Sequence, residues 1–233
     1  MPEVILVVSG RPERRDGLVA AAHRLAALAG AGRVRLLTLG PPAGGAPDVP
    51  VDSLPVGADV VTEVEARGSR ADFVVVAQPA PDDDRATRDA FRTALFRTER
   101  PVLMVPPGGP FGTFGRRVAI AWRDDAGTMK ALVPAIPLLA GAEQIHLLAG
   151  VRAGMATPAI PPVLVEHGVP ATLHVLAIDS SPFGELLLGR ARELGADLLV
   201  MGAYAHGALR DMLLGGMTRT ILARADLPVL LRH

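Results

Sequence analysis

The sequence predicts an α/β protein of two tandem doubly wound parallel-sheet domains, the first of them abbreviated. Three observations predict it: apolar strand-like runs alternate with helical patterns, the same order of segments occurs twice, and a Pro- and Gly-rich stretch separates the two copies. That stretch is PPGGPFGTFGRR, residues 106–117, and we expect domains over residues 1–108 and 113–233.

Each copy opens with a strand, a helix and a second strand. Residues 4–8, VILVV, form a continuous apolar run that is typical of a strand buried on both faces. Residues 18–28 place apolar side chains at helical spacing, Ala29-Gly30 is a stop signal, and residues 34–39 predict the next strand. The second copy repeats this order with strands over 118–122 and 145–148 and a helix over 131–140.

Later segments also match, which indicates an internal duplication of about 115 residues. ADFVVVAQ from Ala71 corresponds to ADLLVMGA from Ala196, and RPVLMVPP corresponds to LPVLLRH near the carboxyl end. The last strand of each copy is expected to begin at proline, Pro101 or Pro228, because a residue without an N–H suits the first position of a strand. Right-handed crossovers between parallel strands place helices on both faces.

The copies differ in length in their middle parts. The second copy predicts a helix over 163–167, a strand over 171–177 and a helix over 182–194, with Ser181 as cap and Pro182 in the first turn. The matching part of the first copy is about fourteen residues shorter, so at least one helix is expected to be lost there. Pro134 and Pro137 are expected to kink or shorten the helix over 131–140.

Composition and missing motifs exclude several function classes. Lys+Arg and Asp+Glu are 24 each, so the net charge attracts neither nucleic acid nor a membrane surface. The chain has no cysteine, and its six histidines form no HExxH or close ligand pair, so no protein-held metal is predicted. GxxxxGK[ST], GxSxG and a GxGxxG after the first strand of either copy are missing. Without a signal peptide or an apolar run of spanning length, a cytoplasmic protein is expected.

The most informative stretch is residues 196–233. An apolar run, Leu198 to Met201, ends at Gly202, and Gly215-Gly216 precedes a helical pattern over 217–225 and a last strand over 228–231. Glycines between a strand end and a helix start allow an anion to approach unpaired N–H groups, where an open α/β sheet binds its ligand.

This stretch resembles the carboxy-terminal signature of the universal stress protein family. In that family glycine, two residues, glycine, nine residues, then glycine with serine or threonine hold the phosphates of ATP. Gly202 matches the first glycine and Gly215 the third, whereas Ala205 stands at the second glycine and Gly216 at the serine or threonine. Relatives often carry an aspartate after the first strand as a nucleoside contact, and Arg123 stands at that position.

The resemblance implies a strand order of 3-2-1-4-5 in each domain and a non-enzymatic role in the stress response. Its ligand would be ATP with its associated Mg²⁺, in the second domain. Its partners would be a second copy in a homodimer and, through the last strands, the other half of the chain in an internal pseudo-dimer. The candidate ligand-binding residues are Ala121, Trp122, Arg123, Gly202, Ala205, His206, Gly215, Gly216, Met217 and Thr218.

Other interpretations of the same residues stay open. Gly202 and Gly215 are also explained as tight turns, His206 as a solvent-facing loop residue, and Trp122 as a core residue. Slow ATP hydrolysis would need a base, for which the sequence offers Asp124, Asp125 or His206; no catalytic residue is assigned. A ligand-free dimerisation scaffold is the third hypothesis.

The first copy is expected to bind no nucleotide. Ser9 stands at the aspartate position, and Asp82, Asp83 and Asp84 occupy the start of the helix where an anion would lie. Carboxylates there cap the helix, complement its dipole and repel phosphate.

Overall fold

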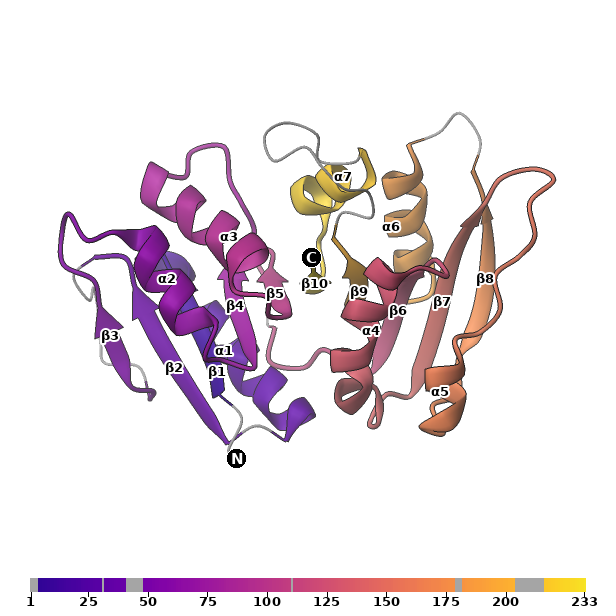
Figure 1. The fold of residues 1–233 in the computed structure, drawn as a ribbon, viewed down its shortest axis with the longest axis horizontal. Coiled ribbons are helices and arrows are strands. Elements are labelled where there is room, and N and C mark those ends of the chain that lie inside the picture. Colours follow the sequence, from indigo (N-terminus) through magenta and orange to yellow (C-terminus); the bar gives the residue numbers. More distant parts are fainter. Residues whose placement is uncertain (1–3, 31, 41–47, 110, 179–181, 204–215) are drawn as a thin grey trace. The chain divides into compact units, whose positions relative to one another are not determined.

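The computed structural model describes residues 4–30, 32–40, 48–109, 111–178, 182–203 and 216–233. The chain divides into two compact units, Met1–Thr113 and Phe114–His233. Each unit is an α/β layer structure with helices flanking parallel strands (Figure 1).

The first unit contains five parallel strands in the order β3-β2-β1-β4-β5. The central strands β1 and β4 are buried along nearly their whole length, as expected for strands covered on both faces. The elements are β1 (Val4–Ser9), α1 (Pro12–Ala29), β2 (Arg33–Thr38), β3 (Val51–Ser53), α2 (Val60–Gly68), β4 (Phe73–Ala77), α3 (Arg85–Arg97) and β5 (Val102–Val105).

The second unit repeats the plan with the order β8-β7-β6-β9-β10, again parallel throughout. Numbered within each unit, both orders are 3-2-1-4-5, so the predicted fold class is confirmed. The elements are β6 (Arg117–Trp122), α4 (Ala126–Leu139), β7 (Gln144–Val151), α5 (Pro162–Glu166), β8 (Thr172–Ala177), α6 (Phe183–Glu193), β9 (Leu198–Gly202), α7 (Gly216–Arg224) and β10 (Val229–Arg232).

Several local predictions are confirmed with shifts of a few residues. Gly30 ends α1 in the left-handed conformation with a φ of 68°, the geometry for which glycine is favoured. The described residues between β2 and β3 contain no helix, whereas α5 occupies that place in the second unit, in keeping with a shortened first copy. The last strands begin one residue after Pro101 and Pro228, whose carbonyls accept hydrogen bonds from Val74 and Leu199.

Two predictions about prolines need correction. Pro182 is the N-cap of α6 and does not lie in its first turn; Ser181, the expected cap, lies outside the described residues. Pro134 and Pro137 do not shorten α4, which continues through both. Pro134 leaves the Lys130 carbonyl without its helical donor, and Arg232 Nη1 donates to that oxygen at 3.3 Å.

The two units share one polar interaction at the start of the first strand of each. The Asp72 carboxylate accepts a hydrogen bond from the Val4 N–H at 2.7 Å. Asp197, the equivalent residue, accepts from the N–H groups of Gly115 at 2.8 Å and of Arg116 and Arg117 at 3.1 Å. Because N–H groups at a strand entrance need partners, this aspartate fixes where β6 begins.

Replacing Asp197 should therefore destabilise the second unit. We expect Asp197→Ala to lower the free energy of unfolding by about 1–3 kcal/mol, since partly buried N–H groups lose their acceptor. Asp197→Asn keeps one carbonyl acceptor and should lose less. Urea unfolding followed by circular dichroism measures both, and equal stability of the two variants would contradict this role.

Candidate functional site

The candidate site of the second unit lies at the carboxyl ends of β6 and β9. These strands are direct neighbours, with Ile120 in register with Val200, so the residues that follow them lie at one edge of the sheet. Gly202 ends β9 and packs against the first turn of α4. A Cβ at Gly202 would lie 2.6 Å from the Gly127 carbonyl oxygen and 3.1 Å from the Thr128 nitrogen.

Gly202 is therefore required by a close backbone contact. It lies in extended strand conformation, so the alternative of a tight turn is not what selects glycine here. A side chain at this position would push the amino end of α4 away from the sheet. The contact with Gly127 and Thr128 had no signal in the sequence, since it joins segments far apart in the chain.

Arg123 and Asp125 interact with each other beside this contact. Asp125 caps α4 by accepting the Thr128 N–H at 2.8 Å, and Arg123 Nε forms an ion pair with its second oxygen. Burial acts to raise the pKa of Asp125, but the Thr128 hydrogen bonds and Arg123 outweigh it and lower that pKa. A carboxylate held deprotonated by these contacts is a weak general base, so Asp125 does not suit the hydrolytic alternative.

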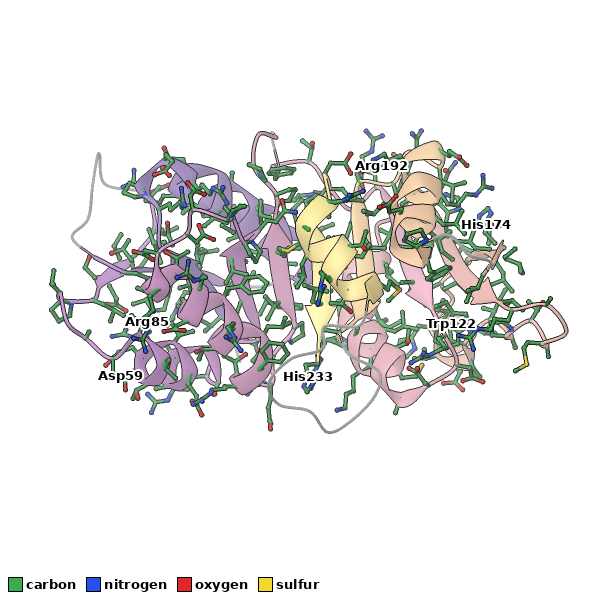
Figure 2. All side chains as sticks on the ribbon, turned by 90° about the horizontal axis from the view of Figure 1, so that it is seen from above. Asp59, Arg85, Trp122, His174, Arg192 and His233 are labelled. Carbon is green, nitrogen blue, oxygen red and sulfur yellow. The ribbon has the colours of Figure 1, made fainter. Side chains whose placement is uncertain are left out.

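Trp122 is a core residue whose side chain is 4% exposed. Figure 2 labels Trp122, the last residue of β6. Its indole N–H donates to the Ala159 carbonyl oxygen at 2.9 Å and ties the segment before α5 to the end of β6. The ring thus has little free surface on which a base could stack, and the core interpretation fits it better. Ala121 is also buried, at 8% exposure.

The remaining candidates lie at the start of α7. Gly216 is exposed, and a Cβ built on it has no atom of the described residues within 4 Å. Met217 is half-buried, and Thr218 is 3% exposed, so its side chain lies among core atoms. Ala205, His206 and Gly215 lie outside the described residues, and the structure does not test them.

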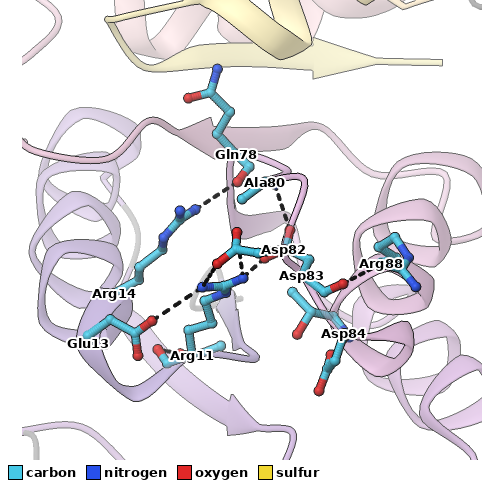
Figure 3. Close-up of polar contacts among 11 residues, drawn as sticks. Arg11, Glu13, Arg14, Gln78, Ala80, Asp82, Asp83, Asp84 and Arg88 are labelled. Carbon is cyan, nitrogen blue, oxygen red and sulfur yellow. Dashed lines mark hydrogen bonds and ion pairs between the residues drawn. The ribbon is translucent and has the colours of Figure 1, made fainter.

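The equivalent edge of the first unit is closed by its own side chains (Figure 3). Asp84 caps α3 by accepting the Thr87 N–H at 2.7 Å, as predicted, and this bond lowers the pKa of Asp84. Asp83 is 5% exposed and accepts from Arg11 Nε at 2.8 Å and from the Ala80 N–H at 2.7 Å. Asp82 pairs with the same guanidinium at 3.0 Å.

Little space remains at that edge for a ligand. The cavity beside Gly10 has a volume of only about 20 Å³. A Cβ at Gly10 would lie 2.2 Å from Thr87 Oγ1, so α3 approaches the end of β1 closely. Arg14 Nη1 donates to the Gln78 carbonyl at 2.8 Å across the same edge. The prediction that Asp82 to Asp84 repel a phosphate thus gains a steric reason, and the role of Arg11 is one that the sequence did not reveal.

A separate polar cluster lies between β7, β8 and α6. His146 Nδ1 and His174 Nε2 are 3.1 Å apart, and Arg190 Nη2 lies 3.3 Å from His174 Nδ1. Since arginine only donates, His174 Nδ1 accepts, so Nε2 carries the proton and donates to His146. His146 Nε2 is then an N–H donor, buried and without a partner among the described residues.

Protonation of either histidine is unfavourable in this cluster, so the stability of the fold should depend on pH. Burial, followed by the charge of Arg190, lowers the pKa of His174; burial, His174, Arg190 and Arg117 lower that of His146. In the unfolded chain both histidines take up protons near pH 6.5. The stabilisation is therefore fully present above about pH 6.5 and is lost as the pH falls through the lower folded-state values.

We expect the free energy of unfolding of the wild type to fall from pH 7.5 to pH 5. A His146→Leu/His174→Leu variant should fall less over the same range, because two proton-binding groups of the unfolded chain are removed. Urea titrations at several pH values measure both slopes. His23→Leu, which removes a histidine outside the cluster, is the control. If the free energy of unfolding of the wild type changed with pH as little as that of the double variant, the assignment would be contradicted.

Within the part of the chain that the structure describes, no group of three or more His, Asp or Glu side chains could hold a metal ion. None of the helices described there is long and apolar enough to cross a membrane.

Strand order and site position together define the class of protein. Two parallel α/β units with the order 3-2-1-4-5, each with its first and fourth strands ending at one edge, define a protein of two doubly wound α/β domains. Residues 162–233 match the universal stress protein family, which confirms the resemblance noted in the carboxy-terminal sequence. None of the curated proteins matches the chain significantly.

Solved structures resemble the whole chain at low sequence identity. A universal stress protein from Archaeoglobus fulgidus DSM 4304 is 14% identical with a TM-score of 0.70, covering 98% of this chain and 95% of that one. A putative universal stress protein from Pseudomonas aeruginosa UCBPP-PA14 is 16% identical with a TM-score of 0.63, covering 99% and 93%. A functionally unknown protein from P. aeruginosa PAO1 is 17% identical with a TM-score of 0.67, covering 99% and 92%. At these identities the likeness shows the fold alone.

Gly202 can be tested by a matched pair of glycine variants. Gly202→Ala should lower the free energy of unfolding by about 1–3 kcal/mol, because its methyl group would overlap backbone atoms of α4. Gly216→Ala should be neutral or slightly stabilising, since its Cβ meets none of the described residues and alanine favours a helix. Thermal and urea unfolding compare the two, and equal stabilities would show that Gly202 is not closely packed.

Proposed function

We propose that the second unit binds a phosphate-bearing ligand, ATP with its Mg²⁺ being the first candidate, and that the first unit binds none. The protein would act as a non-enzymatic binder in a stress response, its ligand state conveying the signal. The observation that carries this proposal is the contrast between the residues that precede the two helices. Asp82, Asp83 and Asp84 come directly before α3, and Asp84 caps it, whereas the sequence directly before Gly216, residues 212–215, is Met-Leu-Leu-Gly, with no carboxylate.

The charge at the start of α7 favours an anion. Its first turn, Gly216 to Arg219, contains no carboxylate, so the N–H groups and the positive end of the helix dipole have no acidic side chain of that turn to neutralise them. Arg219 is exposed and forms no ion pair with another described residue. At the start of α3, by contrast, Asp84 accepts a helix N–H and Asp82 and Asp83 hold Arg11.

Gly216 supports the same proposal on steric grounds. It is the first residue of α7 and is exposed, so a ligand oxygen could reach the backbone there. Trp122 and Arg123 lie at the end of β6, next to β9, and would lie near the nucleoside end of such a ligand. Their own contacts, to Ala159 and Asp125, suggest that they shape this end without stacking on the base.

A titration with two variants of one residue tests the proposal. Trp122 is the only tryptophan and lies at this edge, so its fluorescence reports on binding in the second unit. We expect ATP to bind with one site per chain. Gly216→Asp should weaken binding by about tenfold or more, because it adds a negative charge at the helix start. Gly216→Ala, the uncharged control, should bind within about threefold of the wild type.

Two results would contradict the proposal. Wild-type protein that binds neither ATP nor inorganic phosphate at millimolar concentration would favour the ligand-free scaffold. Equal affinity of Gly216→Asp and the wild type would place the ligand elsewhere. Mass spectrometry of gently purified protein distinguishes an empty scaffold from a protein that already carries a nucleotide.

A further inference from the structure

β8 forms an open edge of the second unit. In the strand order it lies at one end, and within the described residues β7 is the single strand paired with it. β8 is six residues long, TLHVLA, and its sequence has no proline and no Asp, Glu, Lys or Arg. The backbone N–H and C=O groups on its outer side thus form a row that a further strand can join.

The equivalent edge of the first unit is protected in the usual way. β3 is only three residues long and carries a charge at its centre. That residue, Asp52, forms ion pairs with Arg35 at 2.9 Å and with Arg67 at 2.7 Å. Short length and charged side chains are the features that keep an edge strand from pairing. β3 therefore has the features that keep an edge strand from pairing, whereas β8 is longer and carries no charged residue.

Exposed apolar side chains occur in β8 and in the segment that precedes it in the chain. Val175 in β8 is 51% exposed, Val165 in α5 and Met155 in the preceding loop are each 69% exposed, and Ile160 is 39% exposed. That loop and α5 lead directly into β8 (Figure 1). Between residues 153 and 178, Glu166 is the single residue of the Asp, Glu, Lys and Arg types. Apolar area of this kind on a surface marks an interaction site.

We propose that β8 pairs with β8 of a second copy of this chain, in antiparallel orientation about a twofold axis. A second copy fits because the edge carries no charge of either sign, so two identical edges meet without repulsion and each satisfies the other's backbone groups. A partner of opposite charge would find nothing on this strand to recognise.

The pleat of the strand restricts the register. Opposed residues of an antiparallel pair point to the same face, so a twofold register must place one residue opposite itself. A register centred on His174 would bring together two His174 side chains and the Arg190 guanidinium beside each. A register centred on Val175 opposes two exposed valines and pairs Leu173 with Ala177. The second register is the one assigned here.

A charge at the centre of this register should separate the copies. Wild-type protein is expected to show twice the mass of the 24.3 kDa chain in light scattering at about 50 µM, a concentration at which weak pairs associate. Val175→Lys should raise the dissociation constant about 100-fold, because two ammonium groups would face each other. Val51→Lys, at the 36%-exposed position of β3, is the control and should leave the mass unchanged.

Cross-linking tests the same register without a charge. The chain has no cysteine, so Val175→Cys can form a disulfide only between copies. Oxidation should give a covalent dimer from Val175→Cys, since directly opposed residues are close enough for a disulfide. Val51→Cys should stay monomeric in the same denaturing gel. A monomeric wild type, a Val175→Lys variant that keeps the dimer mass, or equal cross-linking of the two cysteine variants would each overturn the proposal.

Discussion

The N–H groups in the first turn of a helix have no partner within that helix, and at the ligand edge of a parallel sheet this requirement governs the structure. In the first unit Asp84 provides the acceptor for α3. In the second unit Asp125 does the same for α4. At α7 the sequence has glycine, Gly215, directly before the first described helical residue, where α3 and α4 each have an aspartate, and that difference separates the two edges.

Arg11 shows how completely the first edge has been closed. An acidic cluster at a helix start would be costly if its charges were left to repel one another. Here the guanidinium of Arg11 contacts both Asp82 and Asp83, and Asp83 also accepts the Ala80 N–H. The set is satisfied internally, so the first unit needs no ligand to complete its hydrogen bonds. Its carboxylates take the place that an anion would have at the equivalent edge.

The fold could be predicted from the sequence because its signals are local. Continuous apolar runs gave β1, β4, β6 and β9, and the repeated order of segments gave the two units. The strand order within each unit came from the family resemblance. The capping role of Asp84 could also be predicted, since an aspartate just before a helix has few other uses. Of the two expected effects of Pro134, shortening of α4 does not occur, and the donor to the freed Lys130 carbonyl is Arg232, about a hundred residues away and not apparent from the local sequence.

The candidate site was harder to predict because several of its residues contact backbone atoms that are far away in the sequence. Gly202 matches a phosphate-loop glycine, yet its described neighbours are the backbone atoms of Gly127 and Thr128. Trp122 could be a ligand platform or a core residue until its N–H was found to donate to Ala159. Asp125 is a candidate base by sequence, but it accepts the Thr128 N–H three residues later, so helix capping explains its position. In each case the same residue type suits a ligand-binding or catalytic role and a structural role, and only its contacts in the folded chain distinguish the two.

The two units share their strand order and differ at their edges. Core positions are constrained by close packing from every side, so the parallel strands and the aspartates at their entrances persist in both units. An edge is constrained only by what meets it. In the first unit Asp82 and Asp83 hold Arg11 at one edge, and Asp52 at the centre of β3 is held by Arg35 and Arg67 at another. In the second unit β8 carries no charged residue. The acidic residues at the edges of the first unit therefore have partners within that unit, whereas the backbone groups on the outer side of β8 remain open to a further strand.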